Sequence, residues 1–359
     1  GIVIVVLSLF AAGGARIASL YTSEAREERI LPNFIRAARF ILLVGGTFLV
    51  LGTSALFVAL LVAGFEPGRA FYHAINLFFA SFDTGGFSTM QASIMYYHSL
   101  SVEVVVMLLM IAGTISFGLH FALWRGDPRE LLRHLESRTL AATSTVFLLV
   151  LAFGLLHAGT YGDLASMFRK GLFTLVSAVT STGHQVNVGQ TYLTDWGVLA
   201  PAAIVGAMAI GGMASSTAGG IKAMRVGIAI KTLVHDIRRI LLPESALQVS
   251  TYYAGGRRRI LRDETSRAAT TVLLLFVVTY LLGAMAALAY GDHDITQTLF
   301  EAVSVGSNIG ITIGVVSPEM PNGLMGIYVV MMWLGRLEFV AVFALLGYLV
   351  SLARGRAKA

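Results

Sequence analysis

The sequence predicts an all-α integral membrane protein in which helix–pore-loop–helix units repeat around a pseudo-fourfold pore. Apolar residues make up 56% of the 359 positions and charged residues only 13%, well below the roughly one quarter typical of soluble domains. In addition, short apolar stretches end in glycine-rich breaks that look alike, and each break precedes a run long enough to span a bilayer. Non-helical backbone survives at membrane depth only where protein buries it or where it lines a watery cavity. Repeated breaks of this kind therefore indicate an ion pathway.

The apolar windows and the basic loops alternate along the chain. All but four of the 26 Lys and Arg residues fall in segments 16–39, 125–138, 222–267 and 354–358. Because Lys and Arg mark the cytoplasmic side, we expect these loops inside. The segments expected outside, each holding one short apolar stretch and one break, are 66–99, 159–195 and 291–322. The windows of about 20 residues or more are 1–20, 39–65, 100–124, 139–158, 196–230, 268–290 and 323–352.

The net charge of +6 is therefore first a topology signal. Lipid headgroups or a cytosolic partner are the secondary interpretations, and nucleic acid is not an expected partner. The chain has no cysteine, which excludes disulfides and thiolate metal sites, and its eight histidines show no HxxxH or HxH pairing. We expect no covalent cofactor.

The expected organisation is a repeat of a spanning helix, a re-entrant helix ending in a break, and a second spanning helix. Residues 1–38 are interpreted as the last helix of repeat one and a cytoplasmic loop, and 39–138 as repeat two. Repeat three, 139–267, includes a broken second helix and a basic loop, and 268–359 holds repeat four and the C-terminal tail. Residue 1 is Gly, and no signal-peptide n-region precedes the first apolar run. We therefore expect this sequence to begin inside a longer chain.

Three breaks are candidates for a selectivity filter of backbone carbonyls. A dehydrating potassium ion needs oxygens where its water shell was, and glycine permits the necessary dihedral angles and close approach. The preceding short helix directs its partly negative C-terminal end at the ion. The side chains of Thr84, Ser181, Thr182 and Asn308 either add oxygens or brace the loop. The predicted filter residues are Thr84, Gly85 and Gly86, then Ser181, Thr182 and Gly183, then Asn308, Ile309 and Gly310.

A fourth break, 211–220, interrupts the apolar window 196–230. Small residues there are typical of close helix packing or of an unwound turn, and paired glycines at both ends favour unwinding. Arg336 lies within window 323–352, and a guanidinium in lipid costs at least ~2.5–3.5 kcal/mol. Because Glu338 lies on a different helix face, we expect Arg336 to bond to carbonyls of the break. The predicted gate comprises Gly211, Gly212, Ser215, Ser216, Thr217, Gly219, Gly220, Lys222 and Arg336.

Several charged positions have two interpretations. Lys222 and Arg225 are either positive-inside anchors or an electrostatic barrier at the pore exit. Asp83 is either a carboxylate near the pore mouth or a solvated loop charge, and Asp294 is expected to be a helix N-cap. Glu301 and Glu338 each need a partner or a water-filled cavity. His184 is either a titrating group beside the filter or a wet vestibule residue, and we favour the second.

These strings resemble the Trk/Ktr/HKT superfamily of potassium transporters, most closely its bacterial TrkH branch. The resemblance is carried by Gly211 to Arg225, by Thr84-Gly85-Gly86-Phe87-Ser88 and Ser181-Thr182-Gly183, and by Trp333 to Glu338. It implies potassium translocation across a bacterial cytoplasmic (inner) membrane, and a homodimer with one pore per subunit. It also implies a cytosolic nucleotide-binding regulatory subunit that docks on basic loops such as 222–267. The sequence departs at Gly183-His184, where the family usually has Gly-Phe, and lacks the first filter.

Other functions remain as alternatives at this point. A sodium-permeable or mixed monovalent-cation transporter has the same architecture. A membrane enzyme is a different class, but Gly86-Phe87-Ser88-Thr89 lacks the second glycine of an intramembrane serine protease, and no GxGD is present. A non-conducting scaffold does not require three matched breaks. A carrier with inverted repeats is disfavoured because every repeat opens from the cytoplasm.

Overall fold

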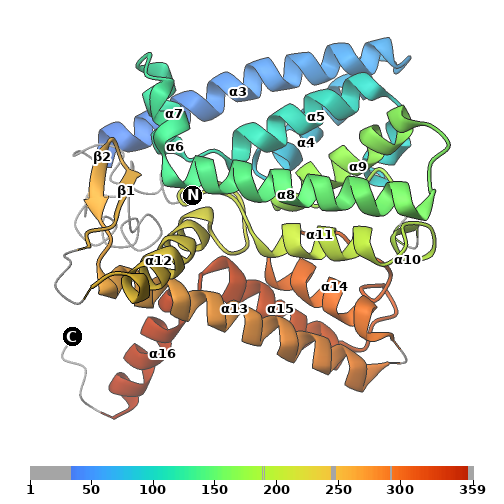
Figure 1. Cartoon of the computed structure of the whole chain (residues 1–359). Coiled ribbons are helices and arrows are strands. Elements are labelled where there is room, and N and C mark those ends of the chain that lie inside the picture. The colour runs from blue at the N-terminus through green and yellow to red at the C-terminus, as the bar shows by residue number, and fades with distance from the viewer. Residues whose placement is uncertain (1–33, 188, 190, 244–247, 292, 355–359) are drawn as a thin grey trace.

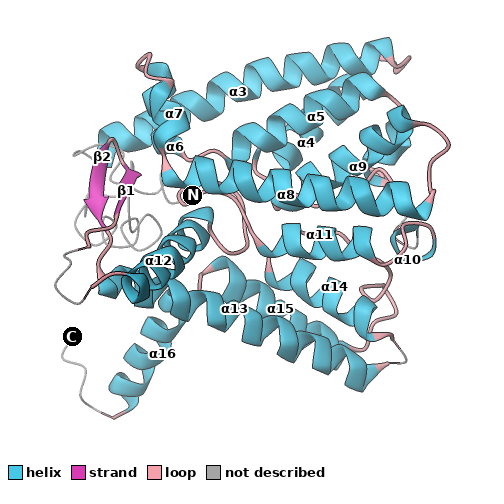
Figure 2. Cartoon of the chain, in the orientation of Figure 1, coloured by secondary structure: helices cyan, strands magenta, loops and turns pink. Residues whose placement is uncertain are grey.

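The computed structural model describes residues 34–187, 189, 191–243, 248–291 and 293–354. Helices make up most of this part and pack side by side in a single bundle (Figures 1 and 2). The window 1–20, and with it most of the segment interpreted as the end of repeat one, lies outside the described residues. The predicted helical membrane fold is confirmed.

The first helix of each expected repeat is long, continuous and apolar. These helices are α3 (Phe34–Val62), α8 (Leu135–Ala158) and α13 (Asp263–Tyr290), and all three are long and apolar enough to cross a membrane. Each begins earlier than its apolar window, in polar sequence. Val50, Leu149 and Leu274 on these helices are roughly two-thirds exposed (65%, 65% and 63%), as expected of surfaces that face lipid rather than water.

The expected re-entrant helices are present as α4 (Pro67–Phe82), α9 (Leu164–Val179) and α14 (Ile295–Gly306). Local signals start each of them: a proline in the first turn of α4, and side-chain caps at Asp163 and Asp294. The predicted N-cap at Asp294 is confirmed, and with Gln297 it forms a capping box. Each helix ends directly before a glycine break, so the breaks begin at equivalent places.

The second helix is broken in all three repeats. The break expected in repeat three separates α11 (Leu199–Ala209) from α12 (Ala223–Leu241). The single helices expected over 100–124 and 323–352 are wrong. The first divides into α5 (Leu100–Thr114) and α6 (Phe117–Trp124), bent by 100°, and the second into α15 (Asn322–Arg336) and α16 (Val340–Ala353), bent by 106°.

Capping and burial account for both unexpected bends. Ile115 is extended, and the Ser116 side chain then accepts a hydrogen bond from the Leu119 N–H, which restarts the helix. At the other bend Glu338 and Phe339 take left-handed φ values of 54° and 63°. This turn buries Phe339 to 2% exposure. Its ring packs edge-on against Phe276 of α13, with ring centroids 4.9 Å apart.

One small sheet departs from the all-α expectation. Strands β1 (Thr251–Ala254) and β2 (Arg257–Ile260) form an antiparallel hairpin in the basic segment 222–267. Gly255 and Gly256 both have positive φ (59° and 74°), as a two-residue type I′ turn requires. The remaining short helices are η1 (Ser93–Tyr97), α7 (Arg129–Arg133) and α10 (Thr191–Thr194). The hairpin and α7 lie at one end of the bundle and α10 at the other (Figure 1).

The largest buried cluster joins segments 139–267 and 268–359, the expected third and fourth repeats. Its fully buried members include Trp196, which precedes α11, Phe276 of α13 and Phe300 of α14. A second cluster, around Leu77 and Met110, packs α4 against α3 and α5. The three re-entrant helices are thus held from outside by packed side chains, which fixes the positions of the breaks that follow them.

Candidate functional site

The three breaks share one backbone conformation. In each, the residue after the helix C-cap has a left-handed φ of 50–57°: Thr84, Ser181 and Asn308. Two residues later comes a glycine with positive φ: 66° at Gly86, 94° at Gly183 and 92° at Gly310. Left-handed φ is unfavourable for a side chain with a Cβ, so an identical pattern in three places is a built feature of the fold.

The N–H groups of each break bond back to the end of their own helix. Gly85 donates to the Ala80 carbonyl, Thr182 to that of Ser177 and Ile309 to that of Ser304, all at 2.9–3.0 Å. Gly183 and Gly310 donate to the side-chain oxygens of Ser177 and Ser304. Within the described part of the chain, the carbonyls of the nine predicted filter residues accept no hydrogen bond. These oxygens are therefore available to a cation.

The breaks lie against one another in the order of the repeats. A Cβ added to Gly86 would lie 2.0 Å from the Thr182 carbonyl oxygen, and one added to Gly183 would lie 1.8 Å from that of Ile309. Only glycine fits such contacts. At Gly310 an added Cβ would meet nothing within 4 Å among the described residues. The structure thus brings the three predicted filter strings into one contiguous array.

The polar side chains of the array brace it. The Thr84 hydroxyl donates to that of Thr217 at 3.2 Å, and Ser181 donates to the Gly219 carbonyl at 3.3 Å. Asn308 donates through Nδ2 to the Met332 carbonyl, and the Thr182 and Thr180 hydroxyls are 2.8 Å apart. Of the two alternatives for these side chains, the contacts favour bracing over ion ligation.

His184 is not a wet vestibule residue, and the favoured interpretation is wrong. Its side chain is fully buried (0% exposed), with Nε2 3.1 Å from the Ser81 hydroxyl at the end of α4. Its carbonyl accepts a hydrogen bond from Ser177 of α9 at 2.8 Å. The imidazole stands where the resemblance implies an apolar side chain, and through its ring and its carbonyl His184 contacts the ends of two re-entrant helices. Asp83, in contrast, is exposed at the C-cap of α4.

The predicted break 211–220 is an unwound loop, as expected. Its two ends close on each other through hydrogen bonds from Gly211 N–H to the Ile221 carbonyl and from Ala223 N–H to the Gly212 carbonyl. A Cβ on Gly211 would lie 1.8 Å from the Gly219 carbonyl oxygen, so glycine at these two paired positions lets the strands approach. We call residues 211–220 the crossing loop.

The crossing loop touches the ends of all three re-entrant helices. Thr217 donates to the Phe82 carbonyl at the end of α4, at 3.0 Å, and to the Gly113 carbonyl of α5, at 2.9 Å. The crossing loop contacts the end of α9 through the hydrogen bond from the Ser181 hydroxyl to the Gly219 carbonyl. An added Cβ on Gly219 would lie 2.3 Å from the Ser307 carbonyl oxygen after α14. The loop therefore lies directly beside the array.

Charged side chains hold this loop at three points. Arg336, exposed at the end of α15, donates from a terminal guanidinium nitrogen to the Thr217 carbonyl at 2.8 Å, which is the predicted contact. Lys222 donates to the Ala218 carbonyl. Glu136, buried at the start of α8, accepts from the Ala214 N–H at 2.8 Å. Glu136 was not predicted from the sequence, although an acidic residue just before the apolar window 139–158 was a visible signal.

The remaining charges have defined partners. Glu338, in the turn between α15 and α16, forms an ion pair with Arg225, so neither is a free surface charge. Ser216 donates within the loop to the Met213 carbonyl at 2.6 Å. Ser215 has a left-handed φ of 57° and accepts the Phe117 N–H at 3.4 Å through its carbonyl, which ties the loop to α6.

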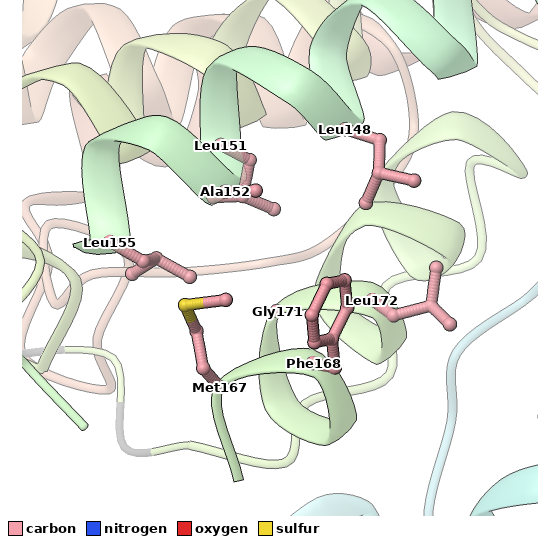
Figure 3. Close-up of a pocket in the computed structure, with 8 residues that line it drawn as sticks. All are labelled: Leu148, Leu151, Ala152, Leu155, Met167, Phe168, Gly171 and Leu172. Carbon is pink, nitrogen blue, oxygen red and sulfur yellow. The ribbon is translucent and has the colours of Figure 1, made fainter. Parts of the chain in front are cut away.

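A narrow cleft between α8 and α9 is not a cation path. Aliphatic and aromatic side chains and a methionine line it, and the side chains contain no oxygen or nitrogen (Figure 3). Among the described residues no group of three or more His, Asp or Glu side chains is arranged to hold a metal ion. The carbonyls of the array, which accept no hydrogen bond among the described residues, are the candidate cation ligands.

Together, spanning helices, re-entrant helices and carbonyl-lined breaks define a multi-pass membrane protein of the re-entrant-loop type. The TrkH family of cation transport proteins matches residues 1–347. The chain belongs to this family.

Relatives and a solved structure agree. An uncharacterized cation transporter of Methanocaldococcus jannaschii is 32% identical over 358 residues, covering 96% of this chain and 67% of the relative. The Trk system potassium uptake protein TrkH of Escherichia coli is 24% identical, covering 96% and 69%. The crystal structure of the potassium transporter TrkH from Vibrio parahaemolyticus has the same fold, with a TM-score of 0.76 at 22% identity, over 96% of this chain and 69% of that one.

Proposed function

We propose that this chain forms the ion path of a potassium uptake system. The observation that carries the proposal is the contiguous array of three matched breaks, whose carbonyls accept no hydrogen bond among the described residues. Carbonyl oxygens can replace the hydration shell of a potassium ion. The ring would hold Thr84 to Gly86, Ser181 to Gly183 and Asn308 to Gly310, with further carbonyls beside Gly310 completing a pseudo-fourfold site.

Potassium rather than sodium is proposed as the transported ion. Two of the relatives described above carry names that specify potassium, whereas the M. jannaschii relative is named only for cations. A sodium-permeable or mixed transporter of the same family is the second candidate. The test is uptake of each ion into proteoliposomes that contain the purified full-length protein. We expect potassium to enter faster than sodium; equal uptake supports the second candidate, and no uptake of either ion contradicts the proposal.

The crossing loop is proposed as the gate of this path. It lies beside the array, Arg336, Lys222 and Glu136 bond to its backbone, and Thr217 and Gly219 bond to the ends of re-entrant helices. A gate must exchange between two states separated by only a few kcal/mol, and hydrogen bonds that each contribute about 1 kcal/mol net can be exchanged within that range. Lys222, with its ammonium on the Ala218 carbonyl, would also repel cations at the exit.

The assembly is proposed from the family and from the basic surface. We propose four repeats with the boundaries given above, a homodimer with one path per subunit, and a bacterial cytoplasmic membrane as the location. A cytosolic nucleotide-binding regulatory subunit would dock on the basic segment 222–267, where the hairpin presents Arg257, Arg258 and Arg259. The name of the E. coli relative places that protein in a Trk system, which supports a partnered arrangement.

A further inference from the structure

Glu301 is a buried carboxylate inside the re-entrant helix α14. Its side chain is 1% exposed, and the sequence required a partner for it without identifying one. An unpaired ionised group in such a position costs several kcal/mol, so the groups that face it must stabilise it. The hydrogen-bond donors on its side chain come from segment 312–315, just after the filter glycine Gly310.

Three donors converge on one oxygen of this carboxylate. Oε1 accepts hydrogen bonds from the Thr312 hydroxyl at 2.5 Å, from the Ile313 N–H at 2.8 Å and from the Val315 N–H at 3.3 Å. Hydrogen bonds to an ionised acceptor are roughly twice as strong as neutral ones. With three donors on this oxygen, Glu301 fastens the backbone beyond the filter.

The other two repeats use different fastenings. Leu77 and Thr174 occupy the positions that correspond to Glu301 in α4 and α9. In repeat two the segment after the filter is held by Thr89, whose hydroxyl lies 2.7 Å from Nδ1 of His73. Among the three described repeats, only repeat four therefore has a carboxyl group at this position.

The fastening extends to the neighbouring repeats through Gln185. The Gln185 side-chain amide donates to the Thr312 carbonyl at 3.3 Å, and its backbone N–H donates to the Ser93 hydroxyl at 3.1 Å. The Met95 N–H in turn donates to the Gln185 carbonyl at 3.2 Å. This outer belt of Ser93, Met95, Gln185, Thr312 and Glu301 joins all three described repeats just beyond the array.

We propose that Glu301 is a positioning residue that sets the ion selectivity of the path through the outer belt. The inference rests on the proposed function. By fixing segment 312–315, the carboxylate fixes the carbonyls of Asn308 to Gly310, which directly precede that segment. Residues that hold the ligating groups in place by packing and hydrogen bonds determine the geometry of a binding site as much as the ligating groups do. A site free to contract would accept the smaller sodium ion more readily.

The test uses matched variants of the full-length protein in proteoliposomes. Glu301→Gln keeps a neutral acceptor and removes the charge, and Thr312→Val removes one donor. Glu319→Gln is the control, because it removes a carboxylate from an exposed position of the same outer loop. We expect the potassium-to-sodium uptake ratio to fall about threefold to tenfold in Glu301→Gln, as the loss of one or two hydrogen-bond equivalents predicts. We expect a smaller fall in Thr312→Val and none in Glu319→Gln.

A second measurement separates positioning from general stabilisation. The melting temperature of each purified protein is compared in potassium and in sodium. A positioning role predicts that Glu301→Gln loses the difference between the two ions, whereas a merely structural role lowers both temperatures equally and overturns the proposal. If Glu301→Gln does not fold, the Thr312→Val variant is the test. A potassium-to-sodium uptake ratio in Thr312→Val equal to that of the wild type then overturns the proposal. A wild-type protein without potassium preference overturns the proposed function as well, whereas intact selectivity in Glu301→Gln overturns this inference alone.

Discussion

At the scale of single residues, the array depends on glycines that have no room for a side chain. Gly183 has a positive φ of 94°. A Cβ added to it would lie 1.8 Å from the Ile309 carbonyl oxygen. Composition and repetition in the sequence were enough to predict which glycines the structure brings together. The direction of contact, each glycine facing the next repeat, was not predictable, because it depends on how the repeats pack.

Replacing Gly183 by Ser should impair selectivity. The substitution adds backbone strain of about 1–3 kcal/mol and displaces the Ile309 carbonyl, so the potassium-to-sodium uptake ratio should fall about tenfold, since 1.4 kcal/mol corresponds to a factor of ten. Gly326→Ser on α15, where an added Cβ meets nothing within 4 Å, is the control. An unchanged potassium-to-sodium uptake ratio in folded Gly183→Ser protein would show that this glycine does not line the ion path.

The caps of α9 and α14 should give a pH-dependent contribution to stability. The Ser166 N–H lowers the pKa of Asp163, and hydrogen bonds from the hydroxyl and N–H of Thr296 lower that of Asp294. A lowered folded-state pKa adds stability that is complete above the ordinary Asp value near 3.9 and is lost as pH falls through the lowered value.

The measurement is the melting temperature of wild type and of Asp294→Ala at several pH values. The variant should melt lower near neutral pH, and the difference should shrink only in acid, below about pH 4. Asp127→Ala, an exposed carboxyl outside the caps, should show no such convergence. A difference that stays constant down to acid pH would show that the Asp294 charge does not contribute.

At the scale of elements, the second helices separate what sequence shows from what it conceals. The unwound loop 211–220 was predictable because its glycines and hydroxyls stand out within an apolar run. The bends at Ile115 and at Glu338 were not, because apolar sequence continues through both. They depend on a serine cap and on the burial of Phe339 against Phe276, which are tertiary effects. The hairpin in the basic loop was likewise missed, although Gly255-Gly256 was a visible turn signal.

Removing the arginine that holds the crossing loop should increase ion flux. Arg336→Ala loses the hydrogen bond to the Thr217 carbonyl. The side chain is exposed, so the loss is screened to about 1 kcal/mol, which shifts the balance of loop states about fivefold. Arg129→Ala in α7, an exposed arginine outside both the crossing loop and the basic segment 222–267, is the control. If Arg336→Ala folds, expresses normally and conducts at the wild-type level, the loop is a structural element and the gate lies elsewhere.

At the scale of the whole molecule, the basic loops predict one orientation for the entire chain. The absence of native cysteine makes this testable with single cysteines. A cysteine at Arg257 should be shielded from a membrane-impermeant maleimide in intact cells and react after lysis, whereas one at Glu319 should react from outside. Labelling of both positions in intact cells would contradict the topology, and Glu319 labelled only after lysis would reverse it.

The crossing loop and the array are joined by hydrogen bonds, and this has a thermodynamic consequence. Thr217 is hydrogen-bonded both to the Thr84 hydroxyl and to the Phe82 carbonyl. A movement of the crossing loop therefore alters the array beside it. Two equilibria that share a contact are linked, and the linkage is reciprocal for binding free energies. Any partner that shifts the loop must change the affinity of the array for its ion, and an ion in the array must change the affinity for that partner by the same factor. For the proposed ion path and the proposed regulatory subunit, this linkage makes occupancy of the path itself a regulatory signal.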